Sequence, residues 1–332
     1  MTIAWRKGVL PLALLLLLAG ALWWRPAVRP EGRSQILMGT VVEIEILDPE
    51  TDQSQAAIDA AFAEMARIEA LMTPHRPDSD VTRLSAAQPY TTPARETLEV
   101  IAAGAEISRI SGGAFDLGLG CLIHLWGFAE GEPHRPTDDD IHTALNGVGP
   151  GDVAVVDGQV RKSRPDLQLD LGAIAKGYAV DRAVAILQAA GIQRATVNAG
   201  GDIRLLGDHQ GRPWRIGIQH PRQPQAVLAT LLLADVAVVT SGDYERAFDI
   251  DGVRYHHLLD PRTGLPARGC QSVTIVAKTA MQADALATAA FVLGPVDGLA
   301  LLERLPAVEG LIVAADGSTH LTGGLAERVQ WP

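Results

Sequence analysis

The chain has 332 residues, of which 47% are hydrophobic and 20% are charged. This composition provides enough apolar material for a substantial core, in one large domain or two small ones, and excludes a disordered protein. The formal net charge of −11 argues against a surface that binds nucleic acid, because such a surface needs clustered Lys and Arg to neutralise phosphates. A single phosphorylated ligand is compatible with this charge.

The N-terminal region is predicted to be an export signal. Arg6 and Lys7 precede a nearly unbroken apolar stretch over residues 9–24. Its length lies between the core of a signal peptide and a membrane span of about 20 residues, so cleavage and permanent anchoring both remain open. We therefore expect residues 1–34 to form a signal peptide or membrane anchor plus a linker, and the rest of the protein to lie on the periplasmic side of the bacterial inner membrane.

Residues 41–46 alternate as a strand, and residues 53–72 carry apolar side chains at helical spacing. A second helix is predicted to open at Pro93, with Thr92 as its N-cap, and to stop at the glycine pair 112–113.

The middle of the chain is predicted to contain two hairpins, because Asp-Gly pairs at 157–158 and 251–252 lie between apolar residues. Ala-rich helices are predicted over residues 173–190 and 281–293, each ended by the glycine that follows. Helices therefore alternate irregularly with hairpins. The fold class is α+β and differs from the regular βαβ succession of a doubly wound fold.

The two cysteines, Cys121 and Cys270, are far apart in sequence and lack any CxxC spacing, so they do not form a zinc site. In an oxidising compartment they could pair, but a sequence does not place their Cα atoms within bonding distance. Two separate buried thiols are the alternative.

Four polar clusters are candidates for chemistry, and the first two contain glycine. Residues 170–178 open a predicted helix, whose free N–H groups and dipole can hold a phosphate while Lys176 adds a positive charge. A plain strand-to-helix turn with Asp170 near the cap is the alternative. Residues 198–202 contain paired glycines that let the backbone pass close to a ligand or form a bulge, but they lack the GxGxxG spacing.

The third cluster joins residues 240–246 and 255–264 through the predicted hairpin between them. His257 is predicted on a strand, ahead of Asp260-Pro261, which is a typical turn opener. Taken alone, this histidine is as readily a hydrogen-bonded strand residue, and the segment after it a plain turn.

The fourth cluster is Asp284 and Thr288, four residues apart on a predicted helix and therefore on one face. Carboxylate and hydroxyl oxygens suit a hard cation such as Mg²⁺. The alternative is that Asp284 interacts with the helix dipole in the first turn while Thr288 bonds back to a carbonyl.

Taken together and in this order, the clusters resemble the ApbE family, the FAD:protein FMN transferases. Other segments carry the same resemblance and span almost the whole chain after the linker: residues 38–40, 73–79, 112–116 and 125–128. The resemblance implies an ApbE-like α+β domain over residues 35–332, with mixed antiparallel sheets and packed helices.

The resemblance also implies ligands and roles. FAD would be held by Met38, His75, Ala114, Phe115, Asp116, Asp170 and Lys176. Mg²⁺ would be bound by Asp284, Thr288 and the backbone carbonyl of Ala173. A Thr or Ser hydroxyl of an acceptor, expected to be a flavoprotein subunit of a membrane electron-transfer complex, would attack FAD and release AMP. A base is needed near this hydroxyl; His257 is the first candidate and Asp243 the second.

Other functions use the same donor site. An Mg²⁺-dependent FAD pyrophosphatase would replace the acceptor by water and release FMN and AMP. A flavin-binding carrier would do no chemistry. Residues 316–322 partly fit the stretch that family acceptors carry, so modification of Thr322 is an alternative to a simple Asp-Gly hairpin there.

Overall fold

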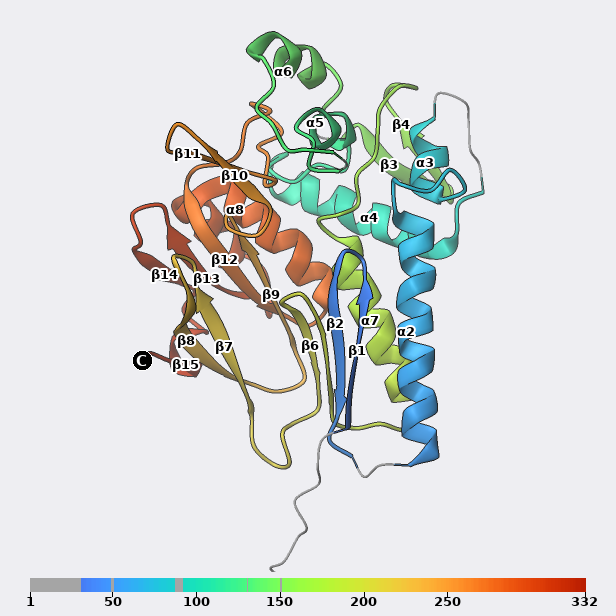
Figure 1. Ribbon diagram of the computed structural model, residues 1–332, viewed down its shortest axis with the longest axis vertical. Helices are drawn as coiled ribbons and strands as arrows, with labels where there is room; N and C mark the ends of the chain where they lie inside the picture. The colour runs from blue at the N-terminus through green and yellow to red at the C-terminus, as the bar shows by residue number, and fades with distance from the viewer. Residues whose placement is uncertain (1–30, 49–50, 87–91, 130, 150) are drawn as a thin grey trace, which may run out of the picture.

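The computed structural model describes residues 31–48, 51–86, 92–129, 131–149 and 151–332 (Figure 1). The apolar stretch predicted as an export signal lies outside the described residues. The predicted linker is too long, because strand β1 (Glu31–Leu37) already contains its last four residues. These residues pair with β2 (Thr40–Ile46) and so belong to the folded domain.

An antiparallel sheet forms the centre of the described part of the chain. Its eight strands lie in the order β1-β2-β5-β6-β9-β12-β13-β14. After β2, its members are β5 (Ala195–Ala199), β6 (Asp202–Leu206), β9 (Ala237–Gly242), β12 (Cys270–Ala277), β13 (Glu309–Ala314) and β14 (Thr319–Leu321).

Alternate residues of the central strands enter two different cores. Val239 and Ile275 pack into the larger cluster, whereas their neighbours Val238 and Val276 pack into the smaller one. Successive side chains of a strand point to opposite faces, so both faces of the central strands are covered. β12 is accordingly buried at every position.

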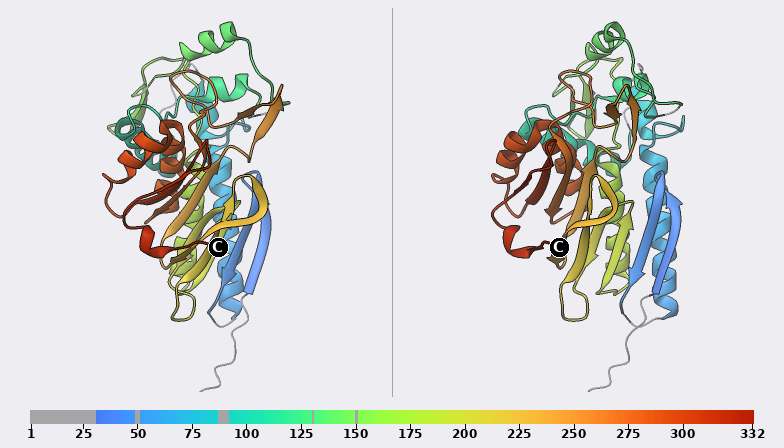
Figure 2. Two further views of the ribbon diagram at one scale, coloured as in Figure 1. Left: turned by 90° about the vertical axis from the view of Figure 1, so that its left-hand side faces the viewer. Right: turned by 60° about the vertical axis from the view of Figure 1, so that its left-hand side comes forward.

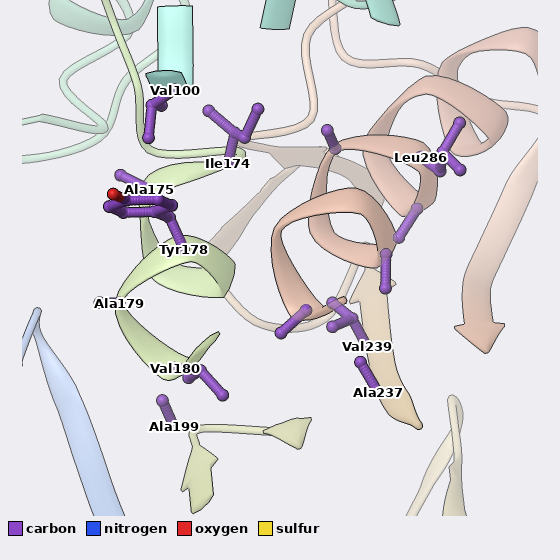
Figure 3. Packing of buried hydrophobic residues seen from close by; sticks show 14 of the residues in the cluster. Val100, Ile174, Ala175, Tyr178, Ala179, Val180, Ala199, Ala237, Val239 and Leu286 are labelled. Atoms are coloured by element: carbon purple, nitrogen blue, oxygen red, sulfur yellow. The ribbon is translucent and has the colours of Figure 1, made fainter. Parts of the chain in front are cut away.

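The larger core lies between the sheet and the helices α2 (Asp52–Met72), α4 (Arg95–Ile110), α7 (Ala175–Ala189) and α8 (Ala280–Leu302). Small side chains such as Ala175, Ala199 and Ala237 fill the space where α7 and α8 meet the strands (Figure 3). α8 has the length and apolar composition of a membrane span, the one such helix among the described residues. Its burial in this core accounts for that composition.

A three-stranded sheet, β15-β8-β7, covers the other face through the smaller core. Its strands are β7 (Trp214–His220), β8 (Gln223–Leu233) and β15 (Val329–Gln330), and the short helix η1 (Ala326–Arg328) precedes β15.

A third cluster lies at one end of the molecule. There the hairpin of β10 (Ala247–Ile250) and β11 (Val253–His256) packs with α5 (Gly120–Leu125) and α6 (Asp138–Leu145) (Figures 1 and 2). The remaining elements are α3 (Asp80–Ser85), β3 (Val153–Val156) and β4 (Gln159–Lys162).

The α+β class and both predicted hairpins are confirmed, while several helix ends differ. α4 begins at Arg95 with Ala94 as an N-cap that makes no side-chain bond, so Thr92 is not the cap. α7 begins at Ala175, because the residues before it form a turn. The predicted end at Gly294 is confirmed, because this residue has non-helical dihedral angles, with φ +84°, and α8 consists of two helices that meet there at a kink. The following Pro295 suits the first turn of the second helix because it needs no N–H donor.

The structure also decides the predictions on the two cysteines and on Thr322. Cys121 and Cys270 are both free thiols, so they do not pair. Thr322 is 1% exposed, donates to Glu309 and accepts from the N–H of Gly310 at 3.0 Å. A hydroxyl buried in this way is not open to modification, and the segment is the β13–β14 hairpin.

Candidate active site

Two tight turns meet at the edge of the predicted site. Met38 and Gly39 form the β1–β2 turn with φ values of +52° and +72°, and Gly200 and Gly201 form the β5–β6 turn with +59° and +100°. A Cβ atom on Gly200 would lie 2.2 Å from the hydroxyl oxygen of Thr40. The first glycine of the pair therefore permits contact between the turns. The close approach to a ligand that its sequence suggests stays a prediction.

The crossing of α7 and α8 brings the first and fourth clusters together. A Cβ atom on Gly177 would lie 2.3 Å from the carbonyl oxygen of Ala280, so glycine is needed for this approach. Asp181 of α7 accepts from the N–H groups of Ala280 and Met281 at 2.8 and 2.9 Å and caps α8. Asp284 lies beyond the first turn, which holds no acidic residue; the helix-dipole alternative for Asp284 is therefore wrong.

Asp284 faces α7 and is 5% exposed. Its Oδ2 accepts a hydrogen bond from the N–H of Gly177 at 3.0 Å. Gly177 lies in the first turn of α7, where backbone N–H groups have no acceptor within the helix, so the Asp284 carboxylate satisfies this one. Thr288 lies one turn further along α8, with its hydroxyl oxygen 3.5 Å from that of Ser241.

A carboxylate, a hydroxyl and a backbone carbonyl are oxygen donors of the kind that Mg²⁺ binds. Among the described residues, no group of three or more His, Cys, Asp or Glu side chains could hold a metal ion by itself. The predicted set of Asp284, Thr288 and Ala173 therefore fits a cation that takes its remaining ligands from water and phosphate oxygens.

Lys176 lies in the first turn of α7, next to Gly177, and its Nζ is 3.2 Å from Oδ1 of Asp202. Burial alone would lower the pKa of this ammonium group. The negative charges of Asp202, Asp284 and Glu245 outweigh that effect and raise the pKa.

The acidic residues whose charges act on Lys176 have raised pKa values. Burial raises the pKa of Asp284 well above its usual range, and Asp202 raises it further against the opposing charge of Lys176. Burial likewise raises the pKa of Asp202 and of Glu245, again against Lys176. The charges of three carboxyl groups thus act on one ammonium group, and two of these groups, Asp202 and Asp284, are almost completely buried. A divalent cation would relieve this imbalance of charge.

Part of the predicted flavin set converges on the loop before α7. The N–H of Asp170 donates to the carbonyl of Leu117 at 2.9 Å, which places Asp170 beside the Asp116 loop. Asp116 accepts from the N–H of Gly118 at 2.6 Å through Oδ1, while its Oδ2 is buried and finds no hydrogen-bond partner among the described residues. Burial raises the pKa of Asp116 to about 6, with Gly118 opposing.

The other predicted flavin residues differ in their burial. Ala114 and Phe115 are each 2% exposed, so both residues are buried, backbone and side chain alike. A pocket of about 160 Å³ is lined by residues that include Pro74, Gln168 and Asp170; its volume is small for FAD. The exposed His75 follows Pro74, just past the end of α2.

Met38 lies at the same end of α2, because its N–H donates to Glu69 of that helix at 2.9 Å. Its positive φ is unusual for a residue other than glycine. Met38 and His75 therefore flank the last turn of one helix, although they are 37 residues apart in sequence.

The adjacent histidines have different surroundings. His256 is 4% exposed, and its ring nitrogens contact the carbonyl of Ala267 at 2.8 Å and the N–H of Leu258 at 3.3 Å. His257 lies just past the end of β11, contrary to its predicted place on a strand. Its Nδ1 is buried without a hydrogen-bond partner among the described residues. Burial lowers the pKa of His257 well below the usual range, and the charge of Arg246 lowers it further.

Asp243, the second candidate base, follows β9. Both carboxylate oxygens accept from Arg222 at the tip of the β7–β8 hairpin, at 2.6 and 2.7 Å. A bidentate pair of this kind is strong and fixes the carboxylate. Asp243 is therefore better placed to hold the segment after β9 than to receive a proton.

Sequence reasoning missed the partners of Lys176 and Asp243. Asp202 belongs to the second polar cluster and Glu245 to the third, but nothing in the sequence indicates that they approach a lysine on another element. Arg222 belongs to no cluster at all. The alternation of strands could place these residues near a turn, but the contacts depend on how the two sheets and α7 pack.

The chain belongs to the ApbE family, whose sequence model matches residues 38–312. Proteins named FAD:protein FMN transferase are similar over almost its whole length. The one from Treponema pallidum is 33% identical over 98% of this chain and 95% of its own length. For the one from Rhodobacter capsulatus the values are 34% and 98%, but this chain spans only 64% of that relative's length.

Solved structures share the fold. An ApbE protein from Thermotoga maritima superimposes with a TM-score of 0.82 at 35% identity, covering 89% of this chain and 98% of that protein. The flavin transferase ApbE from Vibrio cholerae gives a TM-score of 0.80 at 31% identity, covering 90% and 100%. Coverage and identity together confirm the predicted ApbE-like fold.

Proposed function

We propose that this enzyme transfers FMN from FAD to a Thr or Ser hydroxyl of an acceptor protein and releases AMP, in a reaction that depends on Mg²⁺. The names of its relatives support the reaction class. Within the structure, the hydrogen bond from Gly177 to Asp284 carries the proposal. It joins the Asp284 carboxylate to the first turn of α7, next to the only lysine of that helix, which is a suitable place for a metal ion and a pyrophosphate.

In the proposed reaction the acceptor oxygen attacks the phosphorus on the FMN side of FAD. The new bond joins that phosphorus to the acceptor, and the bond to the AMP oxygen breaks. His257 receives the proton of the attacking hydroxyl. Its lowered pKa keeps the ring neutral near pH 7, and its Nδ1 has no hydrogen-bond partner among the described residues.

Asp284, Thr288 and the carbonyl of Ala173 would hold the metal ion. When bound, Mg²⁺ supplies positive charge to the pyrophosphate oxygens as negative charge builds on them. Lys176 adds a second positive charge from the first turn of α7. On the flavin side, Asp116 and Asp170 offer polar groups close to one another, and Met38 and His75 offer side chains at the end of α2.

The acceptor and the compartment are part of the same proposal. The acceptor is a flavoprotein subunit of a membrane electron-transfer complex, and the apolar N-terminal segment exports the enzyme or anchors it. Residues 35–332 then act on the periplasmic side of the inner membrane as one flavin transferase domain, to which residues 31–34 contribute the start of β1.

A single incubation tests the reaction class. The protein is mixed with FAD, Mg²⁺ and an acceptor domain that contains a target Thr, and AMP and the intact mass of the acceptor are measured. We expect AMP together with an acceptor heavier by FMN. Free FMN with an unmodified acceptor would make the protein an FAD pyrophosphatase. Bound but unchanged FAD would make it a carrier.

A further inference from the structure

Asp202 is the most deeply buried acidic residue of the site. It is the first residue of β6, it follows the turn of Gly200 and Gly201, and it is 1% exposed. Its register opposite Ala199 fixes its backbone. The side chain therefore has little freedom, and it points at one group, the ammonium of Lys176, at 3.2 Å.

A purely structural role explains this pair poorly. A buried ion pair adds little net stability, because desolvation offsets the attraction unless further hydrogen bonds satisfy both groups. Oδ2 of Asp202 is buried and has no hydrogen-bond partner among the described residues, and an unsatisfied buried group destabilises the fold. Such an arrangement at a candidate active site indicates a functional constraint.

The neighbours of Lys176 suggest what the constraint is. The residue lies beside Gly177, whose N–H holds Asp284, and the charges of Asp202, Asp284 and Glu245 all act on its ammonium group. If Asp202 lost its charge, the flexible lysine would turn to another carboxylate. Asp284 is the one that the proposed function needs for the metal ion.

We propose that Asp202 is a positioning residue, which holds the ammonium group of Lys176 away from Asp284 and so keeps the Asp284 carboxylate open to a divalent cation. The inference rests on the metal assignment in the proposed function. It adds that Lys176 competes with the cation whenever Asp202 cannot hold it.

The test measures Mn²⁺ binding alone, by electron paramagnetic resonance, without FAD or acceptor. Asp202→Asn should weaken Mn²⁺ binding on the order of 10-fold, the effect of losing one charged contact. Glu245→Gln removes one negative charge that acts on Lys176 but leaves the contact between Lys176 and Asp202 at 3.2 Å in place. It should change Mn²⁺ binding less than about 3-fold.

The decisive comparison is a double-mutant cycle with Lys176→Met, because coupling reveals action through another residue. In the Lys176→Met background, Asp202→Asn should change Mn²⁺ binding by less than about 2-fold. The proposal is overturned if Asp202→Asn has the same effect in both backgrounds, if Glu245→Gln equals it, or if the wild-type protein binds no Mn²⁺ at millimolar concentration.

Folding is checked on every variant by circular dichroism. If Asp202→Asn does not fold, Asp202→Ser, which is smaller and leaves space for water, takes its place in the same cycle. Since neither FAD nor an acceptor is present, a wild-type protein that binds Mn²⁺ but transfers no FMN would refute the proposed reaction and leave the positioning role intact.

Discussion

His256 and His257 are adjacent, but only His257 has a ring nitrogen that lacks a partner within the described structure. We expect His257→Ala to reduce FMN transfer by about 10²- to 10⁴-fold, the usual contribution of a general base. FAD affinity should change little, because the base acts on the acceptor. Single-turnover transfer and FAD fluorescence quenching measure the two quantities.

His256→Ala is the matched control. Its ring bonds to Ala267 and Leu258 in the core, so its loss should lower the melting temperature while the remaining folded enzyme keeps transferring FMN. The assignment of His257 fails if His257→Ala retains full turnover.

Asp116 makes stability depend on pH. Its pKa is raised from 3.8 to about 6 in the folded protein, so the folded state binds a proton more tightly than the unfolded state. The resulting stabilisation is complete below pH 3.8 and is lost as the pH rises through 6. Asp116→Asn should therefore gain about 1 kcal/mol relative to wild type between pH 5 and pH 7.5.

Urea unfolding at these two pH values measures the difference for Asp116. Asp78→Asn serves as control, because Asp78 is exposed and Arg76 lowers its pKa. Relative to wild type, Asp78→Asn should lose stability as the pH rises, and this change should lie below pH 5. Equal shifts for Asp116→Asn at both pH values would show that its carboxyl is not protonated in the folded state.

At the scale of elements, the site depends on how closely α7 and α8 approach. Gly177→Ala should destabilise the protein by about 1–3 kcal/mol, because the new methyl group would overlap Ala280 and push the helices apart. It should also weaken Mn²⁺ binding, since the bond from Gly177 to Asp284 would lengthen.

Ala185→Gly on the exposed face of α7 is the control for helix propensity. It should cost about 1 kcal/mol and leave Mn²⁺ binding unchanged. If Gly177→Ala binds Mn²⁺ as wild type does, the contact between the helices does not shape the metal site.

The sequence predicts some of these elements and contacts but not others. Helical spacing predicts α2 and α8, and Asp-Gly pairs predict both hairpins, because these signals act over a few residues. The second helix of α8, which begins after Gly294, was not predicted, since a glycine that ends a helix gives no information on the element that follows. Asp284 and Thr288 are placed on one face by spacing alone, whereas the pairing of Lys176 with Asp202 depends on long-range packing.

At the scale of the whole molecule, three layers bring together residues that are distant in sequence. The main sheet supplies the turns at Met38 and Gly200, the helical layer supplies Lys176 and Asp284, and the small sheet supplies Arg222. The α+β class was predictable, because the burial of apolar faces requires such layers. The strand order, with β5 and β6 between β2 and β9, was not, because it is set by contacts distant in sequence.

The most direct test of the central claim is the intact mass of a Thr-containing acceptor after incubation with FAD and Mg²⁺, with the wild-type enzyme and with Asp284→Asn. The account predicts an added FMN from the wild type and none from the variant within the same time. An acceptor that stays unmodified with wild type, or gains FMN equally fast with Asp284→Asn, would contradict it.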